Sequence, residues 1–175
     1  MKQPRDINYT NTNAYSPLKR VDVIGKPIEI IEGKSNSNII NVLDKLYWVT
    51  DLKPPTNFKN AFFFNVDNDL KYFPFNKDFG PLNLAMVHRY SRELARLLRD
   101  KSYQENRIFH YCSAAEPGHK MVNGAFLMGA FMIVILKMTA EQAHEKFRPY
   151  QAMFKHYRDA SKGSCFYNCT LLHCL

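Results

Sequence analysis

The residues from Ile108 to Gly118 combine a thiol with a loop that could hold an anion. The apolar run Ile108-Phe109-His110-Tyr111-Cys112 predicts a short buried strand that ends at a cysteine. Small residues follow in the loop Ser113-Ala114-Ala115-Glu116-Pro117-Gly118, and a long apolar helix is expected over residues 119–138. Loop amides and the positive end of a helix dipole attract anions, and a positive field holds a thiol as the nucleophilic thiolate. This layout is typical of cysteine-dependent attack on a phosphate ester.

The loop lacks the arginine that such chemistry requires. An active loop carries an arginine six positions after its cysteine, where the guanidinium binds the phosphate, and that position after Cys112 is Gly118. Glu116 adds a negative charge inside the loop, and two like charges about 4 Å apart cost about 4 kcal/mol at an effective dielectric of about 20. His110 lies two residues before the cysteine, whereas the active motif has histidine directly before it.

We therefore predict that residues 112–118, called the candidate loop below, form a degenerate phosphate loop with no catalytic residue. Cys112 is then a buried structural thiol. The alternative is a divergent active phosphatase that uses Cys112 as its nucleophile.

Four arginines form a second candidate site. Arg89, Arg92, Arg96 and Arg99 recur at intervals of three, four and three residues in a segment with helical periodicity. At about 100° per residue they share one narrow helix face, called the basic stripe below, and Glu93 neutralises only part of it. One interpretation is an ordinary solvated face; the other is a docking surface for acidic or phosphorylated protein partners.

Composition restricts the class of protein. The chain has 175 residues, 46% of them hydrophobic, and a formal net charge of +8, which fits one domain with an acidic or phosphorylated partner. The basic residues are dispersed rather than interleaved with aromatics, which argues against nucleic acid. The most apolar segment, residues 124–136, is shorter than the roughly 20 residues that span a bilayer, and no apolar run follows Met1. We expect no membrane span, no signal peptide and a reduced, intracellular protein.

The cysteines and histidines do not predict a metal site. Cys165 and Cys169 are spaced by one helical turn, with His173 and Cys174 nearby, but this spacing matches no common zinc pattern. We expect neither a metal nor a cofactor.

Strands and helices alternate along the chain, which predicts a single α/β domain with a central mixed sheet flanked by helices. Strands are expected at residues 46–50 and 61–66, the second interior to the sheet, with an edge strand at 70–73. A helix is expected over 82–100, with Pro81 at its first position and Leu84, Val87, Leu94, Leu97 and Leu98 facing the core.

The two ends of the chain differ in character. Residues 1–38 are polar and predict a flexible N-terminal extension, with a short strand at 27–31, so that the folded domain covers 39–175. Thr139 is expected to cap a helix over 140–147. An apolar helix is expected over 165–175, and no capping or polar residue ends it, which suggests that the natural chain continues.

Several runs match one family in order and spacing. They are Leu46-Tyr47-Trp48-Val49-Thr50, the run 78–87 that begins Asp78-Phe79-Gly80-Pro81, the helix 125–130 and the closing segment with Arg158-Asp159-Ala160-Ser161. This pattern resembles the N-terminal domain of the cell-division-cycle-fourteen dual-specificity protein phosphatases. The resemblance covers residues 43–175.

The resemblance implies a protein-tyrosine-phosphatase-like fold in a non-catalytic half that precedes a second, catalytic domain bearing the His-Cys-x5-Arg loop. The chain would scaffold that domain in cis and shape access of phosphoserine, phosphothreonine and phosphotyrosine substrates, with a homodimer as a further option. The family also implies a cell-cycle role in mitotic exit, in the nucleus and cytoplasm with spindle-pole, centrosomal or nucleolar association. The alternative is a stand-alone module that binds acidic or phosphorylated peptides.

Overall fold

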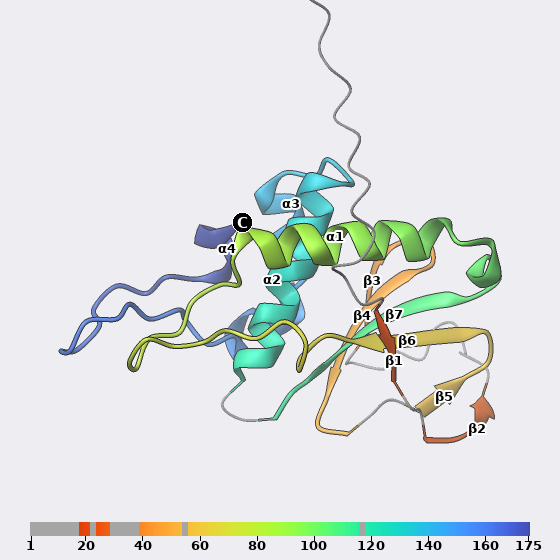
Figure 1. The fold of residues 1–175 in the computed structure, drawn as a ribbon, viewed down its shortest axis with the longest axis horizontal. Helices are drawn as coiled ribbons and strands as arrows, with labels where there is room; N and C mark the ends of the chain where they lie inside the picture. Colours follow the sequence, from red (N-terminus) through yellow and green to blue (C-terminus); the bar gives the residue numbers. More distant parts are fainter. Residues whose placement is uncertain (1–17, 22–23, 29–38, 54–55, 116–117) are drawn as a thin grey trace, which may run out of the picture.

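The computed structural model describes residues 18–21, 24–28, 39–53, 56–115 and 118–175. Its centre is a five-stranded mixed sheet of order β1-β6-β7-β4-β3 (Figure 1). The strands are β1 Lys19–Arg20, β3 Ile39–Leu43, β4 Leu46–Asp51, β6 Ala61–Asn65 and β7 Arg107–Ser113. The central strand β7 runs parallel to β4 and β6, whereas β1 and β3 pair antiparallel at the two edges. A separate parallel pair joins β2 Ile24–Ile28 to β5 Thr56–Phe58.

The helices cover one face of the sheet, as Figure 1 shows. They are α1 Leu84–Arg99, α2 His119–Val134, α3 Ala140–Glu145 and α4 Leu171–Cys174, with short 3-10 turns at Lys101–Tyr103 and Arg148–Met153. Helix α2 contacts β7, β4 and the other three helices, which explains why it is apolar around its whole circumference. Within the described ranges no helix is both long and apolar enough to cross a membrane.

Alternation along β6 places its aromatic side chains in two cores. Phe62 and Phe64 pack in the larger core with the helices, whereas Phe63 points to the opposite face, where it stacks on Phe109 at 4.5 Å between ring centroids. Phe58 of β5 covers this second core. The prediction that β6 is an interior strand, apolar on both faces, is confirmed. The α/β class, the mixed sheet and the single domain are also as predicted.

The predicted start of the first helix is wrong. Helix α1 begins at Leu84, and Asn83 is its cap, with a side chain that accepts a hydrogen bond from the Met86 amide at 3.0 Å. Pro81 therefore lies outside the helix. Leu84 does not face the core but is 83% exposed, and Leu82, just before the cap, is buried instead.

The predicted edge strand at residues 70–73 is also wrong. After β6 the chain makes a turn in which the amides of Asp69 and Leu70 both donate to the Val66 carbonyl. Leu70 is buried by this turn, and the chain then runs without a partner strand to Phe73, which is 78% exposed.

Two helix ends differ from expectation. Helix α2 stops at Val134 rather than at 138, because Lys137 has φ 61° and a left-handed residue cannot continue the helix. The expected apolar helix over 165–175 is reduced to the four residues of α4. Residues before it are extended, since the Tyr157 amide donates to the Cys169 carbonyl and Phe79 bridges Arg158.

The Thr139 cap is confirmed, because its hydroxyl and the Gln142 side chain form a reciprocal capping box at the start of α3.

Towards the N-terminus, β2 ends at Ile28, and residues 29–31 of the expected strand lie outside the described residues. The boundary at 38/39 stays a prediction, although β1 pairs with β6 in the main sheet.

Candidate functional site

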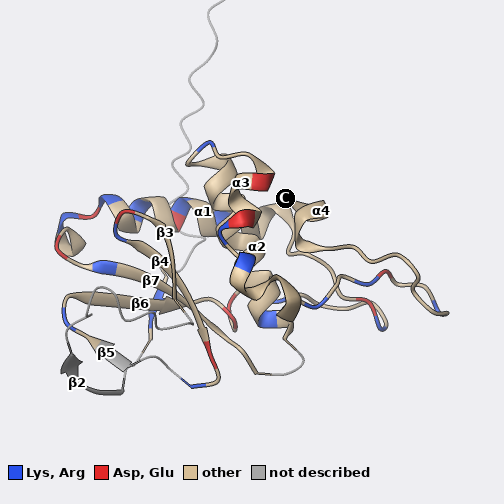
Figure 2. Cartoon of the chain, turned by 180° about the vertical axis from the view of Figure 1, so that it is seen from behind, with Lys and Arg blue, Asp and Glu red and all other residues tan. Residues whose placement is uncertain are grey.

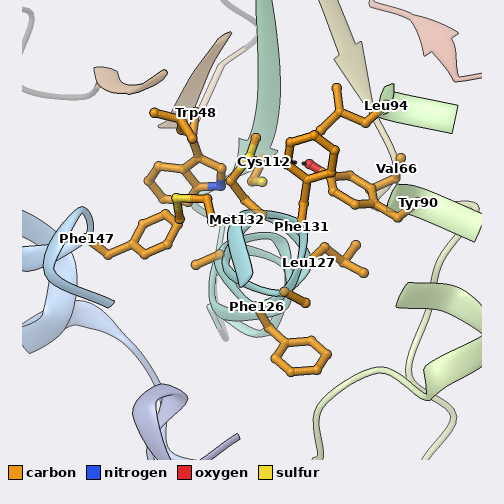
Figure 3. Packing of buried hydrophobic residues seen from close by; sticks show 14 of the residues in the cluster. Trp48, Val66, Tyr90, Leu94, Cys112, Phe126, Leu127, Phe131, Met132 and Phe147 are labelled. Carbon is orange, nitrogen blue, oxygen red and sulfur yellow. Dashed lines mark hydrogen bonds between the residues drawn. The ribbon is translucent and has the colours of Figure 1, made fainter. Parts of the chain in front are cut away.

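Cys112 lies inside strand β7 and is completely buried. Its side chain points from β7 towards helix α2, among Trp48, Phe131 and Met132 (Figure 3). A Cβ atom on Gly124 of α2 would stand 2.1 Å from the Cys112 sulfur, so only a glycine lets the helix pack this closely on the thiol. Burial raises the pKa of Cys112 well above its ordinary value, and the nearby Asp67 charge adds to the effect. The thiol is thus protonated at neutral pH and closed off from solvent.

The described amides of the candidate loop donate hydrogen bonds within the protein. The Ser113 amide donates to Asp67 Oδ2 at 2.9 Å, and the Ala114 amide to the Asp51 carbonyl at 2.9 Å. The Ala115 amide donates to the Ser113 hydroxyl, and the Gly118 amide to the Ala115 carbonyl. An anion cradle requires amides that point to a common empty position, and these four are already used. Glu116 and Pro117 lie outside the described residues, so the predicted repulsion from Glu116 stays a prediction.

Gly118 connects the candidate loop to α2. It has φ +79°, a left-handed conformation that glycine adopts without strain, and it precedes the first residue of the helix. The position that would carry an arginine in an active loop therefore has no side chain and a backbone that favours glycine.

Asp67 is the residue that sequence reasoning missed. Its carboxylate is 8% exposed and accepts the Ser113 amide next to Cys112. Burial raises the pKa of Asp67, while hydrogen bonds from Asn65 and Ser113 and the charge of Lys120 oppose that rise. A carboxylate at this place repels an incoming phosphate dianion. The sequence places Asp67 just after a predicted strand, but only the parallel pairing of β6 with β7 brings it to the same edge of the sheet as Ser113.

A buried polar chain lies under the candidate loop. The Tyr90 hydroxyl is 2.8 Å from His110 Nδ1, and His110 Nε2 is 3.6 Å from the Cys112 sulfur. The imidazole ring stacks on Phe64 with 4.9 Å between centroids. Burial lowers the pKa of His110 to about 3, so the ring is neutral at physiological pH. A neutral ring cannot supply the positive field that would stabilise a Cys112 thiolate.

The basic stripe lies on α1, where Figure 2 shows several basic residues along the helix. Arg92 and Arg96 both contact Glu93, at 3.4 and 3.2 Å, and the Glu93 side chain is only 7% exposed. Arg96 and Arg99 are exposed at the surface and Arg89 is half-buried. The predicted periodicity therefore produces a surface stripe, but one buried carboxylate binds two of its members.

Two extended segments carry exposed aromatic side chains. Residues 71–80 present Phe73 and Phe75, which are 78% and 91% exposed, and residues 158–170 present Phe166 and Tyr167, which are 92% and 64% exposed. We call these segments the aromatic arms. They project from the same end of the molecule (Figure 1) and are joined at their base by the Phe79–Arg158 bridge.

A cavity of about 370 Å³ lies between the first aromatic arm and the start of α2. Apolar side chains such as Leu82 and Leu127 line it together with Asp67, His119 and Lys120. In the described part of the chain no three His, Cys, Asp or Glu side chains gather in a way that could hold a metal.

Comparison with known proteins gives a consistent result. The family model described as "Dual specificity protein phosphatase, N-terminal half" matches residues 38–175. The chain is 41% identical to the mouse dual specificity protein phosphatase CDC14A over 137 residues, which are 75% of this chain and 22% of that protein. It is 40% identical to human CDC14A over 137 residues, with the same coverage, and 32% identical to the Caenorhabditis elegans tyrosine-protein phosphatase cdc-14 over 125 residues, 69% of this chain and 17% of that protein. The chain thus spans about a fifth of the length of the curated relatives it matches.

Proposed function

The chain belongs to the family of N-terminal halves of dual specificity protein phosphatases, and from this premise we propose that it is a non-catalytic half that scaffolds a catalytic domain. In this role it holds the catalytic domain in cis and shapes the access of phosphorylated protein substrates to that domain's active site. The chemistry itself, attack of a cysteine thiolate on a phosphate monoester, takes place in the partner domain.

The observation that carries the proposal is the burial of Cys112 against Gly124. A nucleophile must reach the phosphorus atom, and this sulfur is enclosed between a central strand and a central helix. The Asp67 carboxylate on the Ser113 amide supports the same conclusion, because it occupies a loop donor with negative charge. An active site would need Asp67, the candidate loop and α2 to rearrange together.

The aromatic arms are the surface that we assign to the catalytic domain. Four aromatic side chains, each more than 60% exposed, lie on two segments joined at one end of the domain. Exposed aromatic groups gathered in this way are typical of interfaces, where such side chains provide most of the binding energy.

A chimera tests the scaffold role. The chain replaces the N-terminal half of mouse CDC14A, ahead of that protein's own catalytic domain, and hydrolysis of para-nitrophenyl phosphate is measured. We expect activity close to that of the mouse protein, no hydrolysis by the 175-residue chain alone, and no effect of Cys112→Ser in the chimera. Hydrolysis by the isolated chain that Cys112→Ser abolishes would overturn the proposal in favour of a divergent active phosphatase.

Substitutions in the arms test the docking surface. In the chimera, Phe75→Glu and Phe166→Glu should weaken the contact and lower thermal stability or activity. Leu43→Glu is the matched control, because Leu43 is an exposed apolar side chain (47%) on the edge strand β3 and belongs to neither arm, so this substitution should leave both unchanged. Equal effects of all three substitutions would exclude the arms as the docking surface.

The basic stripe supports a second candidate function, the binding of acidic or phosphorylated protein partners. The exposed Arg96 and Arg99 favour it, while the Glu93 contacts reduce the free charge. Binding of a phosphorylated acidic peptide that weakens with salt and is lost in Arg92→Glu would support it. Equal binding by the native chain and Arg92→Glu would exclude it.

We propose a role in the cell cycle at mitotic exit, as the resemblance to the cell-division-cycle-fourteen family implies. Location in the nucleus and cytoplasm, association with spindle poles, centrosomes or the nucleolus, and a homodimer belong to the same proposal. Imaging of the tagged protein through division and light scattering of the purified chain test these points. A location that does not change through division, or a monomer at all concentrations, would remove the corresponding part.

A further inference from the structure

Two cysteine thiols lie side by side near the end of the described chain. The sulfur atoms of Cys169 and Cys174 are 3.5 Å apart, and both residues are half-buried. The bond length of a disulfide is about 2.05 Å, so a closing movement of about 1.5 Å separates the pair from a covalent bridge. Side-chain rotation can supply a movement of that size without a change of fold.

Each thiol is positioned by its own structural element. Cys169 is held in extended conformation, because the Tyr157 amide donates to its carbonyl at 2.8 Å. Cys174 lies in α4, which is anchored by the buried Leu171 and begins at the Thr170–His173 capping box. Tyr157 is itself buried, and its hydroxyl donates to Asn123 of α2 at 3.3 Å. The pair is therefore preorganised by packing on α2.

A metal is not the explanation for this arrangement. A zinc ion bound by protein side chains alone needs four ligands, and the described residues contain no group of three or more suitable side chains. The nearest histidine, His173, places its Nδ1 3.1 Å from the Thr170 amide in the capping box. Two thiols in contact with no further ligand are the arrangement of a dithiol.

We propose that Cys169 and Cys174 form a reversible intramolecular disulfide that ties α4 to the extended segment before it. With oxidised glutathione as the oxidant, one protein thiolate attacks the glutathione disulfide and releases a glutathione thiolate. The second protein thiolate then attacks the protein sulfur of this mixed disulfide and releases the second glutathione thiolate. Two protein thiols are oxidised and one oxidised glutathione is reduced to two glutathione thiols, which take up the two protons.

The environment predicts how the reaction depends on pH. Burial, followed by the hydrogen bond and charge of Cys169, raises the pKa of the Cys174 thiol. Little Cys174 thiolate is present at neutral pH, so the rate of disulfide formation should rise as the pH is raised from 7 to 9. The bridge, once formed, ties α4 to Cys169, and Leu175, which follows α4, packs directly on Gly129 of α2.

Mass spectrometry of the folded 175-residue chain tests the proposal. The chain is treated with oxidised glutathione without denaturant, remaining thiols are alkylated, and the protein is cut with chymotrypsin. Cleavage after Tyr167, Leu171 and Leu172 separates the three C-terminal cysteines, so a Cys169–Cys174 disulfide joins the peptides 168–171 and 173–175. We expect loss of two of the four thiols, a mass decrease of about 2 Da, and full reversal by dithiothreitol.

Matched variants decide between the outcomes. Cys165→Ser and Cys112→Ser should form the bridge in native yield, whereas Cys169→Ser and Cys174→Ser should not form it. In guanidinium the preference for the Cys169–Cys174 disulfide over disulfides with Cys165 should be lost, because packing on α2 sets the geometry of the pair. A product in which Cys165 is linked to either partner, a stable mixed disulfide with glutathione in place of the bridge, or four alkylated thiols would each overturn the proposal.

Discussion

Acidification should destabilise this protein through one buried histidine. His110 is fully buried, stacks on Phe64 and faces the Tyr90 hydroxyl and the Cys112 thiol, neither of which is a negative charge that could compensate a proton. Burial lowers the pKa of His110 from 6.5 to about 3. Between these two values the unfolded chain binds a proton that the folded chain does not, so the free energy of unfolding falls as the pH is lowered through 6.5.

The size of the effect follows from linkage. Each pH unit below the unfolded pKa is worth about 1.36 kcal/mol, and the step from pH 7 to pH 5 therefore lowers the free energy of unfolding by about 2 kcal/mol. This value depends on the unfolded pKa alone as long as the folded pKa lies well below 5. For a domain of this size the melting temperature should fall by about 4–8 °C from this residue. His144, whose pKa is also lowered by burial, changes stability in the same direction.

Urea denaturation at pH 7 and pH 5 measures the change, and three variants isolate its source. His110→Phe and His110→Gln should be less stable at pH 7, because the Tyr90 contact is altered. Their loss between pH 7 and pH 5 should nevertheless be smaller than that of the native chain by about 2 kcal/mol. His88→Gln, at an exposed position on α1, should keep the native pH dependence. An undiminished loss in both His110 variants, or an imidazole NMR signal of His110 that titrates above pH 5, would show the argument to be wrong.

Three further substitutions test the packing around the candidate loop and the helix caps. Gly124→Ala should destabilise the protein by about 3 kcal/mol in urea denaturation, because the added Cβ atom would clash with the Cys112 sulfur. The double variant with Cys112→Ala should recover most of that loss. Additive losses in the double variant would contradict this explanation. Asp67→Asn keeps an acceptor for Ser113 but removes a carboxyl group whose pKa is raised in the fold. The stability of the variant relative to the native chain should therefore rise between pH 3.5 and pH 7, since the native carboxyl group contributes stability only below its folded pKa; a flat difference would exclude this. Thr139→Ala should destabilise by about 1 kcal/mol and lower the melting temperature by about 2–4 °C, whereas an unchanged melting temperature would show that the capping box is not important.

Local patterns located most elements of the fold. The sequence correctly predicted the strands β4, β6 and β7 from their apolar runs and the helix α1 from its periodicity. This is possible because a strand or helix must bury one face whatever its neighbours are. Prediction failed at element ends and at the expected edge strand over residues 70–73, which the structure does not form. Leu84 fits the apolar spacing of α1 but lies at the first helical position, and only the placement of α1 on the sheet decides that this position is exposed. Residues 165–170 have apolar helical spacing, yet the bridge of Cys169 to Tyr157, distant in sequence, holds them extended.

In the candidate loop, too, some features follow from residue type and spacing and others from the packing of the fold. From the sequence alone, a thiol at a strand end, a small-residue loop, a helix start and the absent arginine at Gly118 were all determined, since each is a property of residue type and spacing. Three features follow from the packing of the folded chain: the Cys112 sulfur lies against Gly124, Asp67 accepts the Ser113 amide, and His110 is neutral. These depend on which strands are neighbours and how closely α2 approaches the sheet. Burial and pKa are set by groups that are distant in sequence and meet only in the folded chain.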